Sequence, residues 1–508
     1  MIQRRRRRWL RVIVLVASAA APAHQVRGQA DSTSIEELRR ELEVMKQQMQ
    51  GLQEQMRKQE QVIRALEEKE GKRVATPAET VSPPVATASP PAAPAAVEAA
   101  APSTTTALDR ALAEARTEAP RPAVPGLVAR QLGPATFRLI DISWVTLFAA
   151  GTSTERNATL EDLEGGAHDP NQRGFTLQQG ELSLSGAVDP YFTGESHIVF
   201  TPDGVELEEA FLTTTALPYG LQLEAGHFFT EFGRINPLHP HAWNWIDQPV
   251  INTRLFGGDG LRNPGFRLGW LAPLPWFSEV SLGAQNASGE TAVSYLGEQE
   301  GEGIGNRPLV DRDVRNLGDL LYLTRWENAW TLSDSLSMKI GGSGLFGPNA
   351  SGFSEDTRIY GTDLVFKWRP PRNFRGWPFF LIESELMWRD YEAAAVVDSA
   401  GINTLPKTTL YDWGLYVQGL YGFRYGWAGG LRYEYASGSG QSVGGRQSDP
   451  FRADRQRLSP LLVWHPTEFS RIRLQYNFDV AEQLNPNEAH TGWVGFEIFY
   501  GAHAAHKY

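Results

Sequence analysis

Alternating apolar and polar residues, in runs of about ten, recur through the C-terminal three-quarters of this chain. In Arg471–Asp479, polar residues hold the odd positions and Ile472, Leu474, Tyr476 and Phe478 the even ones. Successive side chains of a β-strand point to opposite faces, so a period of two predicts a strand with one apolar and one polar face. Many such segments, with aromatic residues near their ends, are typical of a transmembrane β-barrel with lipid outside and a wet lumen inside.

The pattern predicts about sixteen antiparallel strands between residues 135 and 508, and a barrel of this size leaves an aqueous channel. The connections mostly alternate long and short, as in barrels with short periplasmic turns and long outer loops. The connection at Pro202-Asp203-Gly204 is short where a long one is expected. The predicted strands lie near 136–149, 174–188, 191–201, 205–217, 219–229, 264–272, 277–287, 319–332, 334–346, 357–369, 377–391, 409–423, 425–437, 455–466, 469–480 and 490–501.

One connection is unusually long and has no period of 2 or 3.6. It occupies residues 230–264, between an alternating segment that ends at Phe229 and one that starts near Phe266. Compact domains seldom hold so long a structureless loop unless it is functional. Its Trp, Phe, His, Asn, Pro and Gly content differs from that of flexible linkers and disordered tails. We therefore expect this loop to fold into the barrel and narrow it.

The N-terminus has the features of a secretory signal peptide, residues 1–30. Arg4–Arg8 form a basic region and Val12–Ala21 an apolar region, and small residues allow cleavage after Ala23 or Ala30. The apolar region is too short to span a bilayer as a helix, and no other stretch of about 18 apolar residues occurs.

Residues 31–70 are predicted to form an α-helical coiled coil in the periplasm. Ten positions spaced alternately by three and four residues, nine of them apolar, form the seam of a heptad repeat. A single amphipathic helix is the alternative. Residues 71–134 are rich in Pro and Ala and are predicted to be an extended linker. The seam consists of Ile35, Leu38, Leu42, Met45, Met49, Leu52, Met56, Gln59, Ile63 and Leu66.

Composition narrows the classes of function. The formal net charge of −11 argues against nucleic acid as a partner. The chain has no cysteine, which excludes disulfides and thiolate metal sites. No Gly-x-Ser-x-Gly elbow, His-Glu-x-x-His motif or phosphate-binding loop occurs, so we expect neither an enzyme nor a cofactor.

Five short motifs of the barrel region match those of a known family: Gly174-Phe175, Val188-Asp189-Pro190-Tyr191, Gly226-His227-Phe228, Glu231-Phe232-Gly233-Arg234 and Pro264-Gly265-Phe266. On these motifs the barrel region resembles the phosphate-selective porin family of Gram-negative outer membranes. The resemblance implies a sixteen-stranded homotrimeric porin with a constricting third loop, and anion selectivity from an arginine ladder and a lysine cluster.

The charges of the barrel region depart from that family. Its lysines number only four: Lys339, Lys367, Lys407 and Lys507. About 44 acidic residues stand against about 28 basic ones from residue 135 onward. This balance disfavours a strongly anion-attracting pore, so we do not expect phosphate specificity.

Charged and aromatic residues of the long loop and its flanks are the candidate constriction. Their arginines either line the pore and bias ion passage, or pair with Glu231, Asp247 or Asp259 and hold the loop against the wall. We expect the tryptophans, with Phe256, to anchor the loop rather than bind solute. The candidates are Arg234, Arg254, Arg262, Arg267, Glu231, Asp247, Trp243 and Trp245.

Two pairs of closely spaced histidines are weaker candidates for a metal site. His239 and His241 lie in the loop, and His503 and His506 in the C-terminal tail. Imidazoles at such spacing can bind zinc or copper. Polar histidines without a metal are the default interpretation of both pairs.

We therefore expect an outer-membrane porin of a Gram-negative-type bacterium. Small hydrophilic solutes or ions would diffuse passively through its lumen, filtered by the 230–264 loop. One alternative is a substrate-specific channel, for an anion such as phosphate or for a metal-related solute. Another is a structural envelope tether, in which the coiled coil holds the barrel to peptidoglycan or to a periplasmic partner.

Overall fold

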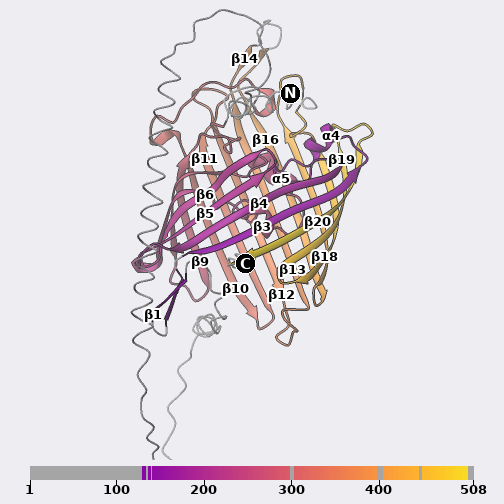
Figure 1. The fold of residues 1–508 in the computed structure, drawn as a ribbon. Helices are drawn as coiled ribbons and strands as arrows, with labels where there is room; N and C mark the ends of the chain where they lie inside the picture. The colour runs from indigo at the N-terminus through magenta and orange to yellow at the C-terminus, as the bar shows by residue number, and fades with distance from the viewer. Residues whose placement is uncertain are drawn as a thin grey trace, which may run out of the picture. The chain divides into compact units, whose positions relative to one another are not determined.

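Sixteen antiparallel strands close into a barrel, because the last of them, β20, pairs with the first, β3 (Figure 1). This computed structural model describes residues 129–132, 135–138, 140–297, 303–397, 404–445 and 449–501. The strands are β3(Asp141–Ser153), β4(Gly174–Ala187), β5(Phe192–Thr201), β6(Gly204–Thr214), β7(Leu221–Phe229), β8(Arg262–Leu271), β9(Phe277–Asn286), β10(Leu320–Ser333), β11(Leu336–Pro348), β12(Asp356–Trp368), β13(Phe379–Ala393), β16(Thr408–Arg424), β17(Trp427–Ser439), β18(Arg455–Thr467), β19(Ser470–Ala481) and β20(Glu488–Gly501).

The prediction of about sixteen antiparallel strands is confirmed, and each predicted segment overlaps one barrel strand. The main difference lies at the start. The first barrel strand begins at Asp141, and a separate hairpin of β1(Ala129–Leu132) and β2(Ala135–Arg138) precedes it. β1 lies within residues 71–134, which were predicted to be an extended linker. Its four residues form a strand because they pair with those of β2. The predicted signal peptide and coiled coil, residues 1–70, lie outside the described residues.

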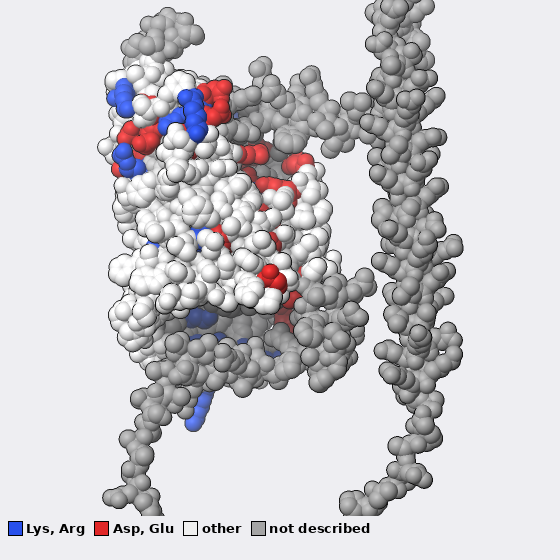
Figure 2. All heavy atoms as spheres, turned by 90° about the vertical axis from the view of Figure 1, so that its left-hand side faces the viewer, with Lys and Arg blue, Asp and Glu red and all other residues white. Residues whose placement is uncertain are grey.

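The two faces of each strand have the expected character. In β19, Leu474 and Tyr476 are 54% and 42% exposed, whereas Arg473, Gln475 and Asn477 between and beyond them are buried. Figure 2 shows the result over one face of the molecule. The middle of the barrel carries few charged side chains, apart from acidic atoms in a recess, and charged atoms gather near one rim. An uncharged band of this kind is the surface that a transmembrane barrel presents to lipid.

Leu474→Arg should therefore destabilise the barrel in lipid. Leu474 lies on the exposed face in the middle part of β19, and an arginine facing lipid at the bilayer midplane costs roughly 2–4 kcal/mol. Leu474→Met is the matched control, since it keeps the face apolar. Unfolding free energies in lipid vesicles, from urea titration, compare the two. Equal stabilities would show that this face does not meet lipid.

Most connections at one end of the barrel are longer than those at the other end. The first and third connections at the long end, residues 154–173 and 230–261, contain the helices α4(Asn157–Leu163) and α5(Val250–Phe256). Only Pro202 and Asp203 join β5 to β6, as the sequence indicates. In the part of the chain that the structure describes, no helix is both long and apolar enough to cross a bilayer.

The lumen is less uniformly polar than the sequence predicts. A hydrophobic cluster lies between the loop of residues 230–261, the segment of residues 287–297 and the inner wall. From the wall, Leu323, Leu345 and Ile359 contribute, each at most 5% exposed. These positions face protein instead of water because the loop covers them. Inward-facing wall residues are therefore polar where they contact water or form hydrogen bonds to the loop, and apolar where the loop packs on them.

Candidate functional site

The loop of residues 230–261, called the lumen loop from here on, crosses the inside of the barrel. It leaves the wall after β7 and rejoins it at β8. Its middle bonds to β17, β18 and β19. In the closed order of sixteen strands, β18 stands eight places from β8, on the opposite side. The lumen loop thus spans the inside of the barrel, from β7 and β8 to the opposite wall.

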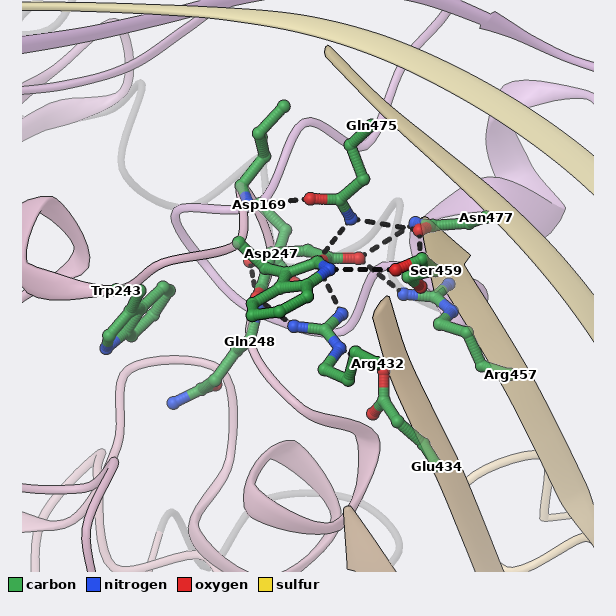
Figure 3. A network of polar contacts seen from close by, with 12 residues as sticks. Asp169, Trp243, Asp247, Gln248, Arg432, Glu434, Arg457, Ser459, Gln475 and Asn477 are labelled. Carbon is green, nitrogen blue, oxygen red and sulfur yellow. Dashed lines mark hydrogen bonds and ion pairs between the residues drawn. The ribbon is translucent and has the colours of Figure 1, made fainter. Parts of the chain in front are cut away.

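Asp247 fastens the lumen loop to that opposite wall (Figure 3). One carboxylate oxygen accepts hydrogen bonds from Arg432 Nη2 at 2.5 Å and Gln475 Nε2 at 2.7 Å. The other accepts from Arg457 Nη1 at 2.7 Å and Asn477 Nδ2 at 2.8 Å. These four donors come from three adjacent strands. Asp247 is 1% exposed, so this ion pair is shielded from water.

The wall arginines of β19 bind the backbone of the lumen loop. Arg471 donates to the carbonyls of His241 and Trp243, and Arg473 to those of Trp243 and Trp245, at 2.7–3.2 Å. Trp245 Nε1 donates to the Ser459 carbonyl at 3.0 Å. Both tryptophans are buried, as expected of loop anchors.

The four predicted arginines lie in four different environments. Arg234 reaches the wall, where its Nε donates to Glu383 at 2.9 Å. Arg254 is 6% exposed and donates to the carbonyl of Ala453 at 2.8 Å. Arg262 pairs with Glu206 and lies over the Phe229 ring. Arg267 lies 3.2 Å from Glu224, and 3.7 Å from Glu231 and from Glu279. The structure therefore does not bring the four together.

Of the three acidic residues predicted to pair with these arginines, only some do so through their side chains. Glu231 lies within ion-pair distance of Arg267, as the alternative interpretation proposes. Asp259 accepts from Arg262 through its backbone carbonyl. Asp247 instead pairs with arginines of the wall. Among the predicted charged residues and their predicted partners, Arg234, Glu231 and Asp259 keep the most exposed side chains, at 13%, 24% and 36%.

His239 and His241 enter a cluster of histidines and glutamates at the wall of β4, β5 and β6. His239 Nδ1 lies 2.9 Å from Glu208 Oε2, and its Nε2 lies 2.8 Å from Glu209 Oε2. His241 Nδ1 lies 3.0 Å from Glu181 Oε2. His197, on β5, lies 3.1 Å from the other Glu181 oxygen. His503 and His506 lie outside the described residues.

Burial and charge set the pKa values of the lumen-loop side chains. Although burial would raise it, Arg432 and Arg457 hold the pKa of Asp247 well below its usual range. Although burial opposes a charged imidazole, Glu181 and Glu208 hold the pKa of His239 well above its ordinary value. Asp247 therefore carries its negative charge at neutral pH.

Glu164 and Asp169, in the loop of residues 154–173, lie near Asp247, and their pKa values are raised instead of lowered. Burial, together with Asp247 and Asp479, raises the pKa of Glu164 to about 8 against the effect of Arg457. Burial and Asp247 raise the pKa of Asp169 to about 7. Of the three loop carboxyl groups, Glu164, Asp169 and Asp247, Asp247 is therefore the one that most strongly keeps its negative charge.

Sequence reasoning missed most wall partners of the lumen loop. It identified the period of two that puts Arg471 and Arg473 of β19 on the polar face, but no signal relates that face to Asp247. The acidic run Glu206–Glu209 in β6 was a usable signal, because three of its four residues are glutamates in a predicted strand. The missed residues are Glu164, Glu181, His197, Glu208, Glu209, Glu383, Arg432, Arg457, Arg471 and Arg473.

Comparison with known sequences gives one informative relative. An uncharacterised protein of Aquifex aeolicus is 30% identical over 398 residues, which cover 73% of this chain and 80% of the relative. No family model matches.

Solved outer-membrane proteins are similar in fold at low identity. The channel DcaP of Acinetobacter baumannii is 12% identical with a TM-score of 0.46, over 71% of this chain and 96% of its own. An anion-selective porin from Comamonas acidovorans is 7% identical with a TM-score of 0.44, over 71% and 99%. OmpT of Vibrio cholerae, an outer membrane protein, is 10% identical with a TM-score of 0.43, over 71% and 97%. Since these TM-scores are below 0.5, nothing about function follows from them.

Proposed function

The chain belongs to one family with the Aquifex aeolicus protein, and we propose that it is an outer-membrane porin. One observation carries the proposal. A closed sixteen-stranded barrel, which carries few charged side chains over the middle of the face in Figure 2, encloses a loop that crosses its lumen. Closure leaves no strand edge unpaired, which is the requirement for a sheet in hydrocarbon. A large barrel of this kind conducts water and solutes wherever side chains do not fill it.

Passage would be passive, and the lumen loop would act as the filter. Its contacts with β13, β19 and the β4–β6 wall hold it at a fixed position. Solutes larger than the remaining opening are excluded by size. Smaller ones meet the fixed charges that stay in contact with water, so the lumen biases ions without any chemical step.

Buried arginines contribute little to that bias. Arg432, Arg457 and Arg473 are each about 1% exposed, and all three donate to the lumen loop. These guanidiniums are bonded to the lumen loop and are shielded from ions in the channel. An arginine ladder of the kind that the family resemblance implies is therefore covered at these positions, which argues against strong anion selectivity.

Arg234→Ala should shift ion selectivity toward cations. The variant removes a partly exposed guanidinium and leaves Glu383, its partner at 2.9 Å, with less positive charge nearby. Reversal potentials in planar bilayers under a salt gradient measure the permeability ratio. Arg372→Ala is the matched control, because Arg372 is exposed in the turn between β12 and β13. An unchanged ratio in Arg234→Ala would remove this residue from the pore wall.

The same bilayers test the proposed function as a whole. A steady ohmic conductance from the purified protein supports a porin. Block by a single anion or metal at low concentration would favour a substrate-specific channel. Absence of conductance from folded protein would overturn the porin and leave the envelope tether.

The assembly proposed around this barrel is a homotrimer in the outer membrane with its coiled coil in the periplasm. The heptad repeat of residues 31–70 supports self-association. An even number of strands returns both ends of the barrel to the periplasmic side, where the coiled coil would meet peptidoglycan or a partner. Cross-linking of intact cells tests the trimer.

A further inference from the structure

We propose that Glu181, His197 and His239 bind a divalent transition-metal cation of the zinc class between the barrel wall and the lumen loop. Glu181 lies on β4, His197 on β5 and His239 in the lumen loop. One ligand atom from each lies within 4.8 Å of the other two. Two ligands would thus come from the fixed wall and one from the loop that crosses the channel.

Each imidazole of the set lies beside a different oxygen of the Glu181 carboxylate. Glu181 Oε1 lies 3.1 Å from His197 Nδ1, and Glu181 Oε2 lies 3.5 Å from His239 Nδ1. Donors placed tetrahedrally at about 2.0–2.1 Å from zinc are roughly 3.3 Å apart. Two imidazoles and one carboxylate form a common donor set for zinc-class ions, and a fourth position stays open for water.

A carboxylate outside this set orients one of the imidazoles. Glu209 Oε2 lies 2.8 Å from Nε2 of His239. If Nε2 keeps its hydrogen on Glu209, a metal at Nδ1 would replace the hydrogen that Nδ1 shares with Glu208 Oε2 at 2.9 Å. Metal-ligating histidines almost always donate their second ring nitrogen to an acceptor of this kind.

The charge and hydrogen bonding around the cluster also favour a cation. Glu181 and Glu208 are at most 1% exposed, and Glu209 is 8% exposed, so three carboxylates share one shielded space. Burying several like charges is costly unless positive charge accompanies them. The nearby ring of His168, 3.9 Å from Glu208, is buried. Its two nitrogens have no hydrogen-bond partner among the described residues.

A bound ion would connect the lumen loop to β4 and β5, whereas Asp247 connects it to β17, β18 and β19. On the proposed function, the loop would then be fixed at both sides of the channel. Metal binding is measured directly, without conductance, so the two proposals fail separately. Loss of conductance with metal binding intact would overturn only the porin, and the reverse result only the metal site.

Equilibrium dialysis of chelator-treated protein in detergent against Zn²⁺ tests the site. The chain should carry His503→Gln and His506→Gln, so that the tail histidines do not contribute. We expect one Zn²⁺ per chain. His239→Gln or His197→Gln should weaken binding at least about 100-fold, and Glu209→Gln roughly 10- to 100-fold.

His490→Gln is the matched control and should bind as the parent does, because its ring contacts Tyr476 and Phe478. Heat-modifiable mobility on gels verifies that each variant is folded. If His239→Gln does not fold, His197→Gln decides. Two results would overturn the site: no Zn²⁺ bound by the folded parent, or equal binding by the parent and the folded ligand variants.

Discussion

Asp247→Ala is expected to release the middle of the lumen loop from the opposite wall and to lower the stability of the folded barrel. The carboxylate accepts from Arg432, Gln475, Arg457 and Asn477 and is 1% exposed. Its removal takes one carboxylate partner from each of two buried guanidiniums, those of Arg432 and Arg457. Removing one partner of a buried ion pair costs about 3–5 kcal/mol.

Most of the lost stability should come from Arg432, because it keeps fewer partners than Arg457. Arg457 retains Glu164 at 2.7 Å and Asp479 at 2.9 Å, whereas Arg432 keeps only Glu434 as a nearby carboxylate among the described residues. The lower half of the 3–5 kcal/mol range is therefore the expected loss. Single-channel recordings should show transitions to a larger conductance level, because the loop then moves within the lumen.

Asp259→Ala is the matched control for this experiment. Asp259 belongs to the same loop, but its side chain is 36% exposed and its bond to Arg262 uses the backbone carbonyl. Loss of an exposed ion pair costs at most about 1 kcal/mol. Denaturant titration and channel recordings compare the two variants. Equal behaviour would mean that the network in Figure 3 does not fasten the loop.

The barrel was predictable from the sequence because its cause is local. Each strand has one apolar and one polar face, which appear in the sequence as a period of two, so β19 can be identified from nine residues. The lumen loop could be predicted because its sequence shows no period of 2 or 3.6. A segment whose side chains contact many different partners has no regular alternation of apolar and polar residues.

The partners of the lumen loop were not predictable, because they depend on register and closure. Arg234 pairs with Glu383, 149 residues away. Only closure of the barrel brings β17–β19 opposite β7 and β8. Local sequence patterns carry no information about partners so far apart, so Asp247 was expected to pair with an arginine of the loop or its flanks.

A β-bulge adds to this difficulty in the histidine cluster. His197 pairs with Glu209, and Ile198 pairs with Leu207, so Glu208 is an extra residue in β6. The bulge lets consecutive residues Glu208 and Glu209 both reach His239. Strict alternation would have placed them on opposite faces, and bulges commonly re-aim side chains in this way.

Excision of the lumen loop should give the largest change in conductance. Thr230 N donates to the Leu261 carbonyl at 2.9 Å, so these two residues already continue the pairing of β7 with β8. Deletion of residues 232–259 with Glu231→Asn would join them through Asn-Gly, the preferred sequence of a two-residue hairpin turn. We expect single-channel conductance to rise roughly two- to fourfold, because sixteen strands enclose a wide aqueous channel once nothing crosses it.

Shortening the hairpin of β14(Val396–Val397) and β15(Thr404–Leu405) is the control, since these strands form a sheet separate from the barrel. Replacing residues 398–403 by Asn-Gly should leave conductance unchanged. The excised barrel should be less stable, because Leu345 and Ile359 lose the loop that covers them. Conductance that stays at the parent level in a folded, loop-free barrel would show that something other than this loop limits passage. Asp247→Ala, which keeps the loop but frees its middle, should then leave conductance unaltered too.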